Sequence, residues 1–350
     1  MMLRGLLFAL LCLSLAVWAR ASTEVPQEVH EVLWEAREEV DAGHLVEALK
    51  RLEAFRKEHP RVRHHLLSFQ MGNICWRLGK KGEALRYWLE ATKLKPEDAP
   101  SWQNLAKAYY EGGHFLKAAQ AFLKAWKLTR DPELRFYGAV SLLKAGGRAG
   151  EALRHLKGLL EGHPARPDYW RALASLYLQR GEYLRAAAAL EVALRFRDER
   201  KVREELAHLY QSAGLWVKAA KALERLHSDP SAEVCDRIAS LYLMAGRTTE
   251  ALKYLDLALS KDPTRGRFLR KGEILYRLRR YREAYDAFKL AASSGDDGYA
   301  HLMMGYCAWH LNDLKKAEEA FRRAANRPSY QREAQQALKA VVEGGERRLM

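Results

Sequence analysis

The chain has 350 residues, of which 48% are hydrophobic, and its 59 Lys and Arg residues outnumber 44 Asp and Glu residues, giving a formal net charge of +15. An apolar share of this size excludes a largely disordered or low-complexity chain. The charge indicates a surface that attracts acidic partners and resists self-association.

Residues 1–21 have the pattern of a secretory signal peptide. Arg4 precedes an apolar core, and Ala19-Arg20-Ala21 forms a small-x-small cleavage site. We expect cleavage after Ala21; the alternative is a retained membrane anchor, although the core is shorter than the ~20 apolar residues that span a bilayer. Because no Asn-x-Ser/Thr sequon is present, we expect export to a bacterial periplasm.

Export argues against nucleic acid as the partner of the positive charge. Anionic lipid headgroups, acidic glycans and acidic protein segments are then the candidates. Downstream of the predicted signal peptide, Cys75, Cys235 and Cys307 form an odd set with no short spacing, which argues against a disulfide framework or a zinc site. We expect Cys75 and Cys235 to be core residues.

The stretch from Trp170 to Ala193 predicts two short helices. Trp170, Leu173, Ala174 and Tyr177 fall at i, i+3, i+4 and i+7 and share one helix face. Gly181 is placed to end the first helix in a left-handed conformation. In the second helix the small residue Ala186 permits close approach of the two backbones.

The same pattern recurs along the chain. Alanines occupy the place of Ala186 at intervals of 32 to 36 residues: Ala48, Ala84, Ala118, Ala152, Ala219, Ala251, Ala284 and Ala317. The place of Gly181 is taken by Gly43, Gly79, Gly113, Gly147, Gly214, Gly246, Arg279 and Asn312. Because arginine does not readily adopt the left-handed region, the turn at Arg279 is expected to differ in shape.

This order of Trp, Leu, Ala, Tyr, Gly, Ala, Leu and Ala resembles the tetratricopeptide repeat. The resemblance implies an all-α, right-handed superhelical solenoid of antiparallel helix pairs. We expect about nine repeats between residues 26 and 328, a capping helix at 329–343 and a flexible tail at 344–350.

The sequence contains no clustered catalytic or metal-binding motif, so we expect no enzyme activity, no cofactor and no metal site. The adjacent pair His64-His65 points in two directions about 100° apart on a helix, which favours a solvated face over a shared metal.

One candidate site lies on the first helices of the second and third repeats, where the resemblance implies a concave groove. The residues concerned are Phe69, Asn73, Trp76, Gln103, Asn104, Lys107 and Tyr110. Asn73 and Asn104 match the two asparagines that hold a peptide backbone in the family's carboxylate-clamp members. Phe69, Leu134 and Gly138 stand where that clamp has basic residues, which argues against binding of a terminal carboxylate. The alternative is that both asparagines are solvated helix residues.

A second groove segment near the C-terminus combines arginines and aromatic residues, which are favoured at interface centres. It comprises Arg237, Arg270, Tyr276, Arg277, Tyr306, Trp309 and His310. We expect Arg270 and Arg277 to contact an acidic partner; the alternative is that about half of this set packs between neighbouring repeats.

The prediction is therefore an exported protein-interaction scaffold that binds a peptide or helix of a partner protein in its groove. The resemblance suggests an assembly or accessory factor of an envelope complex. Two alternatives are binding of anionic envelope lipid or polysaccharide, and an enzyme acting on envelope glycans. The sequence makes no prediction of the oligomeric state.

Overall fold

The computed structural model describes residues 25–293, 295 and 298–346. Within these residues it has nineteen α-helices and no strands, which confirms the predicted all-α class. The predicted signal peptide at 1–21 and the end of the predicted tail at 347–350 lie outside the described residues and stay predictions. No helix in the described part is long and apolar enough to cross a membrane.

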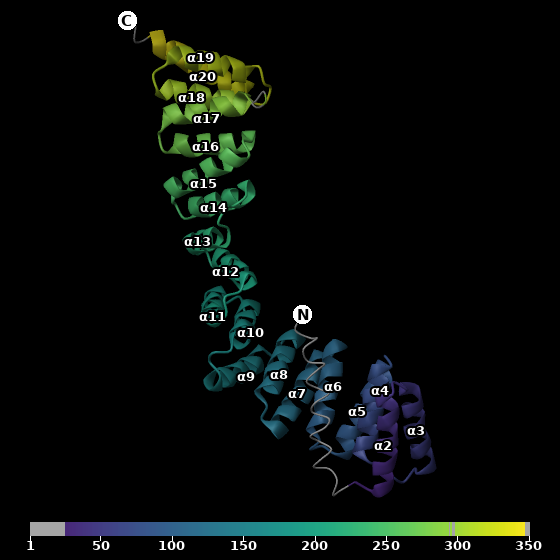
Figure 1. The fold of residues 1–350 in the computed structure, drawn as a ribbon. Helices are drawn as coiled ribbons and strands as arrows, with labels where there is room; N and C mark the ends of the chain where they lie inside the picture. The colour runs from purple at the N-terminus through teal and green to yellow at the C-terminus, as the bar shows by residue number, and fades with distance from the viewer. Residues whose placement is uncertain (1–24, 294, 296–297, 347–350) are drawn as a thin grey trace. The chain divides into compact units, whose positions relative to one another are not determined.

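The chain divides into two compact units, Met1–Leu176 and Tyr177–Met350. In unit 1, successive helices run antiparallel and stack in chain order (Figure 1). They are α2 (Gln27–Asp41), α3 (Leu45–Glu58), α4 (His65–Arg77), α5 (Lys81–Leu94), α6 (Ala99–Glu111), α7 (Phe115–Thr129), α8 (Pro132–Ala145), α9 (Ala149–Gly162) and the start of α10 (Pro167–Gln179).

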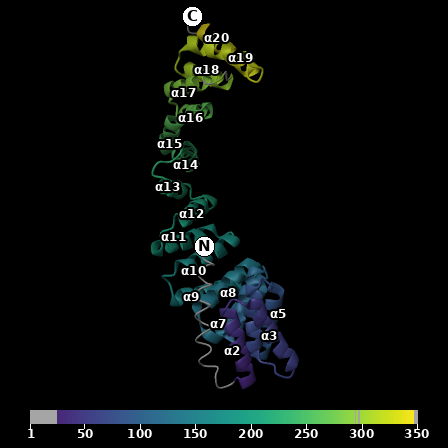
Figure 2. The ribbon, with the colours of Figure 1, turned by 45° about the vertical axis from the view of Figure 1, so that its right-hand side comes forward.

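Unit 2 is built in the same way, and its helices up to residue 293 follow one another in chain order in both views (Figures 1 and 2). They are α11 (Tyr183–Phe196), α12 (Arg200–Ser212), α13 (Trp216–Leu226), α14 (Ala232–Met244), α15 (Thr248–Lys261), α16 (Arg265–Arg277), α17 (Tyr281–Ser293), α18 (Gly298–His310), α19 (Leu314–Ala325) and α20 (Gln331–Glu346).

Each turn inside a helix pair has a residue with left-handed backbone conformation at the same place in the repeat. Gly181 has a φ of 71°, as predicted, and Asn312 has a φ of 62°. The expectation that the turn at Arg279 differs in shape is wrong, because Arg279 adopts a φ of 58°. Its turn keeps the pattern of the others: the Arg279 and Arg280 amides donate to the Tyr276 and Leu275 carbonyl oxygens, each at 2.9 Å. These hydrogen bonds offset the steric cost of a side chain in this region.

The turn that departs from the others is the fourth, where both Gly146 and Gly147 have positive φ. Helix α8 ends at Ala145, and Gly146, Gly147 and Arg148 connect it to α9, which begins at Ala149.

The alanine series forms the closest contacts inside the repeats. All nine alanines, from Ala48 to Ala317, have at most 1% of their surface exposed. The predicted helix-pair contact is confirmed by this burial, since a side chain larger than a methyl group has no room there.

Within a helix pair, the small residue of the first helix contacts the side chain sixteen residues later on the second helix. Where the first helix has glycine, the second has an aromatic ring: a Cβ added at Gly72, Gly272 or Gly305 would lie 2.6, 2.7 or 2.4 Å from the ring of Trp88, Phe288 or Phe321, respectively. The glycines are therefore required by packing against these rings.

The three described cysteines, Cys75, Cys235 and Cys307, are fully buried free thiols, so the prediction that Cys75 and Cys235 are core residues is confirmed. At the C-terminal end, α20 packs on α19 through Ala334, Ala337 and Val341, which join Phe321 in one apolar cluster. Helix α20 begins at Gln331, two residues after the start of the expected capping segment at 329–343, and it continues to Glu346, so residues 344–346 of the expected tail are helical.

Candidate functional site

The two predicted asparagines meet between α4 and α6. Asn104 Nδ2 donates to Asn73 Oδ1 at 2.8 Å, and Trp88 Nε1 donates to the same oxygen at 3.1 Å. Asn73 Nδ2 donates in turn to Gln70 Oε1 at 3.2 Å. Because a carbonyl oxygen has two lone pairs, Asn73 Oδ1 is saturated, and Asn104 is the asparagine that can still accept a hydrogen bond from a bound peptide.

Each of these two helices has an aromatic residue near its C-terminal end, Trp76 on α4 and Tyr110 on α6. The Trp76 ring lies 5.5 Å from the Trp88 ring and has Lys81 Nζ at 5.3 Å. Tyr110 packs edge-on against Phe115, and Lys144 Nζ lies 4.6 Å from its ring centre. Both predicted aromatic residues thus contact a lysine whose charge is held over the ring.

The remaining predicted residues of this segment are half-buried. Phe69 packs against the core of the first repeats, which makes it a structural residue. Gln103 and Lys107 lie on α6 on either side of Asn104 and are partly exposed. The polar part of the site is therefore Asn104 with Gln103 and Lys107.

In unit 2 the predicted arginine Arg270 is held by a neutral partner. Its Nη2 donates to Ser240 Oγ on α14 at 2.8 Å, and Ser240 Oγ donates to the Asp236 carbonyl oxygen at 2.6 Å. Asp236 Oδ2 pairs with Arg267 Nε at 2.8 Å, and the buried Asp236 Oδ1 has no hydrogen-bond partner among the described residues. Among the described residues no carboxylate pairs with the half-buried guanidinium of Arg270.

Arg237 and Arg277 are exposed, Arg237 on α14 and Arg277 at the end of α16. Neither forms an ion pair within the described part of the chain. Other basic residues nearby do, as Lys271 pairs with Asp256 at 2.6 Å and Arg267 also pairs with Asp262. The three predicted arginines therefore form a basic row with unpaired charge on the first helices of the repeats.

An aromatic cluster lies beside this row at the ends of α16 and α18. The Tyr276 hydroxyl is 3.1 Å from His310 Nε2, and the His310 ring stacks on Tyr281 with centres 4.3 Å apart. Trp309 is 39% exposed. Tyr306 instead donates to Glu333 on α20 at 3.0 Å, and burial followed by this carboxylate raises its pKa to about 12. Trp309 is exposed to solvent, whereas Tyr276 and Tyr306 are half-buried and pack against the core.

Sequence reasoning missed Tyr281 and Met244, which extend this surface. Met244 is 59% exposed at the end of α14. A signal was present, because Met244 occupies the place that Arg277 and His310 occupy in the next two repeats.

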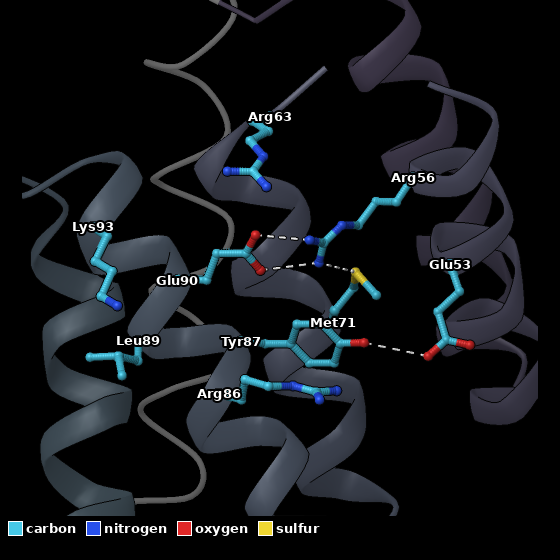
Figure 3. A pocket seen from close by; sticks show the side chains of 9 residues that line it. All are labelled: Glu53, Arg56, Arg63, Met71, Arg86, Tyr87, Leu89, Glu90 and Lys93. Carbon is cyan, nitrogen blue, oxygen red and sulfur yellow. Dashed lines mark hydrogen bonds and ion pairs between the residues drawn. The ribbon is translucent and has the colours of Figure 1, made fainter. Parts of the chain in front are cut away.

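Sequence reasoning also missed an open pocket of about 670 Å³ between α3, α4 and α5. Figure 3 shows Arg56 reaching across it to Glu90, with Nη2 to Oε1 at 2.8 Å. The pocket is lined by Glu53, Arg56, Arg63, Met71, Arg86, Tyr87, Leu89, Glu90 and Lys93. The pairs Arg56–Glu90 and Glu53–Tyr87 are each 34 residues apart, a spacing that indicates neighbours in successive repeats.

The groups most able to do chemistry are engaged in structure. Burial raises the pKa of the Cys75 thiol to about 11 and of the Cys307 thiol to about 12. His64 Nδ1 accepts from the Leu66 amide at the start of α4, and His65 is buried with Nε2 3.9 Å from Asp98 Oδ1. The expected solvated face is therefore wrong for His65. No cluster of His, Cys, Asp or Glu able to hold a metal occurs among the described residues.

The tetratricopeptide repeat family model matches residues 69–133, 137–201 and 269–331, together more than half of the chain. The chain belongs to the tetratricopeptide repeat family. Membership of this family indicates a protein-interaction scaffold. The polar residues around Asn104 in unit 1 and the basic row with Trp309 in unit 2 are at least partly exposed to solvent.

Several solved tetratricopeptide structures resemble the chain in fold. A repeat protein from Parabacteroides merdae is 20% identical, covering 81% of this chain and 99% of its own, with a TM-score of 0.31. The TPR2AB domain of yeast Sti1, solved in a complex with pHSP90, is 16% identical, covering 70% and 98%, with a TM-score of 0.39. Yeast Tom70 is 12% identical, covering 91% and 96%, with a TM-score of 0.33. No curated protein sequence matches the chain.

Proposed function

We propose that this tetratricopeptide protein is a non-catalytic scaffold of the bacterial cell envelope whose repeats in unit 2 bind an acidic segment of a partner protein. The observation that carries the proposal is Arg270, whose guanidinium is held in place by Ser240 and lacks a carboxylate partner among the described residues. Ordering an arginine before binding reduces the entropy lost when it pairs with an acidic group.

The surroundings of Arg270 support a protein segment as the ligand. Arg237 and Arg277 extend the positive charge over two helices, and the exposed Trp309 and Met244 supply apolar area beside it. Aromatic and arginine side chains together are typical of the centres of protein interfaces. An acidic segment that also has apolar residues would satisfy both parts of this surface.

Asn104 and its neighbours in unit 1 support a second contact. The Asn104 amide is held in place by Asn73. It is suited to bind the ligands that the family's groove binds, namely an extended peptide backbone or the polar face of a helix. The proposed protein is exported through the predicted signal peptide and acts as an assembly or accessory factor of an envelope complex.

Crosslinking in the native envelope tests the basic row. A photo-crosslinking residue at Arg237 is expected to capture partner proteins, and Arg270→Gln/Arg277→Gln is expected to reduce that capture at least tenfold. The matched control is Arg322→Gln/Arg323→Gln, which removes the same charge from exposed α19 residues paired with Glu318 and Glu319. Equal capture by both double variants would refute the proposed groove.

Anionic lipid or polysaccharide is the alternative ligand of the positive charge. Diffuse charge attraction is screened within about 3 Å at 1 M salt, whereas an ordered arginine pair resists such screening. Co-sedimentation with anionic vesicles that survives 1 M NaCl and depends on Arg270 would favour this alternative over a protein segment.

A further inference from the structure

The open pocket between α3, α4 and α5 has more positive than negative side chains in its lining. The four basic residues are Arg56, Arg63, Arg86 and Lys93, and the two acidic residues are Glu53 and Glu90. Apart from Arg63 and Met71, the lining residues are on α3 and α5, the second helices of the first two repeats. The residues that carry the proposed function are on first helices, so a ligand bound in this pocket is independent of that function.

One of the four basic groups is neutralised inside the pocket. Arg56 and Glu90 meet across the cavity (Figure 3) through two hydrogen bonds, Nη1 to Oε2 at 3.1 Å and Nη2 to Oε1 at 2.8 Å. Arg56 is half-buried, and its Nη1 also lies 3.7 Å from Met71 Sδ. The pair is therefore fixed in one arrangement and adds no net charge to the pocket.

The other three basic groups, Arg63, Arg86 and Lys93, are exposed and form no ion pair with a described carboxylate. Arg86 is held by a neutral group instead, since its guanidinium carbon lies 5.3 Å from the centre of the buried Tyr87 ring. Glu53 accepts a hydrogen bond from the Tyr87 hydroxyl at 3.4 Å and has no basic partner in the described part of the chain. The lining thus has three unpaired positive charges and one unpaired negative charge.

A pocket of about 560 Å³ occupies the same place in the repeats of unit 2, on α13 and α15. Counted from the alanine series, the places of Glu53, Arg86 and Tyr87 are taken by Glu224, Lys253 and Tyr254. The places of Arg56 and Lys93 are taken by His227 and Ser260. The cavity therefore results from how the second helices of successive repeats pack.

The two pockets differ in charge. In the unit 2 pocket, Lys253 is the one Lys or Arg residue of a lining that also has the carboxylates of Glu224 and Asp256. Lys253 Nζ lies 6.0 Å from the centre of the Tyr254 ring, which matches the contact of Arg86 with its tyrosine. The excess of positive charge in the unit 1 pocket is therefore not a consequence of the repeat architecture.

Three unpaired cations around one cavity favour a ligand with more than one negative charge. A phosphate monoester has about −1.5 to −2 charges at neutral pH and three acceptor oxygens. Each arginine can donate two parallel hydrogen bonds to these oxygens, and a lysine adds a point charge. A single carboxylate would leave most of the positive charge unpaired.

The size of the cavity allows the phosphate to carry an organic group. Its volume of about 670 Å³ lies within the ~300–1,000 Å³ of small-molecule sites. Leu89, which is 37% exposed, offers an apolar contact in the lining.

We propose that the pocket between α3, α4 and α5 binds a phosphate monoester, which pairs with Arg63, Arg86 and Lys93. The Arg56–Glu90 pair stays intact and forms one wall of the site. Glu53 limits the affinity, because its carboxylate repels the phosphate.

Isothermal titration calorimetry of the purified chain with glycerol 3-phosphate tests the site. The wild type is expected to bind one molecule per chain at physiological ionic strength. Arg63→Gln/Lys93→Gln is expected to weaken binding at least tenfold. Glu53→Gln is expected to strengthen it, because the amide removes the repulsion and still accepts the hydrogen bond from Tyr87. Weaker binding by Glu53→Gln overturns the proposal.

Lys253→Gln is the matched control for Arg86→Gln. Each variant removes one positive charge beside a tyrosine ring at the same place in a repeat. Arg86→Gln is expected to weaken binding severalfold, and Lys253→Gln is expected to bind as the wild type does. Equal weakening by the two variants would overturn the proposal, because affinity would then follow net charge and not the pocket. Circular dichroism establishes that every variant is folded.

Succinate is the control for the class of ligand, because it has two negative charges but no phosphate. The wild type is expected to bind succinate at least tenfold more weakly than glycerol 3-phosphate. Equal affinity for the two compounds would overturn the assignment of the site to a phosphate.

Vesicles separate the two sources of a phosphate monoester, a soluble compound and a lipid headgroup. The vesicles are phosphatidylcholine alone and phosphatidylcholine with phosphatidic acid, whose headgroup is a phosphate monoester. Binding of glycerol 3-phosphate without recruitment to phosphatidic acid identifies a soluble ligand. Recruitment that Arg86→Gln abolishes and Lys253→Gln does not identifies the headgroup. A wild-type chain that binds neither probe overturns the proposal.

Discussion

His65 is a titratable side chain with only about a tenth of its surface exposed, and the other polar residues buried to this extent in the described part of the chain are serines and a threonine. It lies at the start of α4 and faces Asp98, His64 and Lys95. Burial lowers its pKa to about 4, and His64 and Lys95 act in the same direction, whereas Asp98 opposes them. The neutral imidazole is therefore the form that the fold accommodates.

This pKa predicts a loss of stability in mild acid. The unfolded chain binds a proton at His65 below about pH 6.5 and the folded chain only below about pH 4, so stability is retained above pH 6.5 and declines as the pH falls toward 4. The difference of about 2.5 pKa units corresponds to up to ~3 kcal/mol.

Thermal melts at pH 7.5 and pH 4.5 measure this effect. The wild type is expected to lose more of its melting temperature over this interval than His65→Gln, which keeps a polar amide but does not titrate. Equal losses in the two proteins would assign the acid sensitivity to the carboxylates instead.

At the scale of the helix pair, glycines of the first helices pack directly against aromatic rings of the second helices. Gly272 lies under the Phe288 ring, whereas Gly266, on the same helix α16, has nothing within 4 Å of the place where a Cβ would be. The two glycines therefore separate the effect of packing from the effect of helix propensity.

Alanine substitutions at these two positions should have opposite signs. Gly272→Ala is expected to destabilise the chain by ~1–2 kcal/mol, because overpacking outweighs the gain in helix propensity. Gly266→Ala is expected to stabilise it by ~0.5 kcal/mol, since only the propensity changes. Urea unfolding of both variants measures the difference. Destabilisation by both to the same extent would show that the Phe288 contact is not the cause.

At the scale of the whole molecule, each repeat packs mainly on its neighbours in sequence. Stability in such arrays is a sum of repeat and nearest-neighbour contributions, so local damage stays local. Gly272→Ala is therefore expected to raise hydrogen exchange in α16 and α17 and their neighbours α15 and α18. Exchange in α4 to α7 of unit 1 should stay as in the wild type. A uniform rise across both units would instead indicate one cooperative molecule.

Charge is also distributed at this scale. The chain is strongly basic overall, yet α2 is acidic and α16 with the start of α17 is basic. Net charge alone therefore does not describe the surface, because charges of opposite sign are concentrated on different helices.

Part of the candidate site could be predicted from sequence because repeats fix positions. Alignment of the units placed Arg270, Arg277, Tyr276 and Trp309 on first helices, and the structure brings Tyr276 together with His310. Alignment could not show that the Tyr306 hydroxyl donates a hydrogen bond to Glu333, because that contact depends on how α20 packs on the repeats before it.

The repeat pattern was readable because it is local. Helix faces repeat every 3.6 residues, left-handed turns select glycine or asparagine, and close backbones select alanine, so residues near in sequence determined the helix pairs. Arg279 shows that the backbone hydrogen bonds of the turn can hold the same conformation in a residue that disfavours it.

The sequence by itself determined the helix pairs, the turns that contain a single left-handed glycine or asparagine, and the alanine contacts. Only the tertiary structure decided which side chains of successive repeats share their hydrogen bonds: Asn73 is saturated by Trp88 and Asn104, and Arg270 is held by Ser240. The physical reason is that a hydrogen bond forms over about 3 Å, and which groups come that close depends on how neighbouring repeats pack.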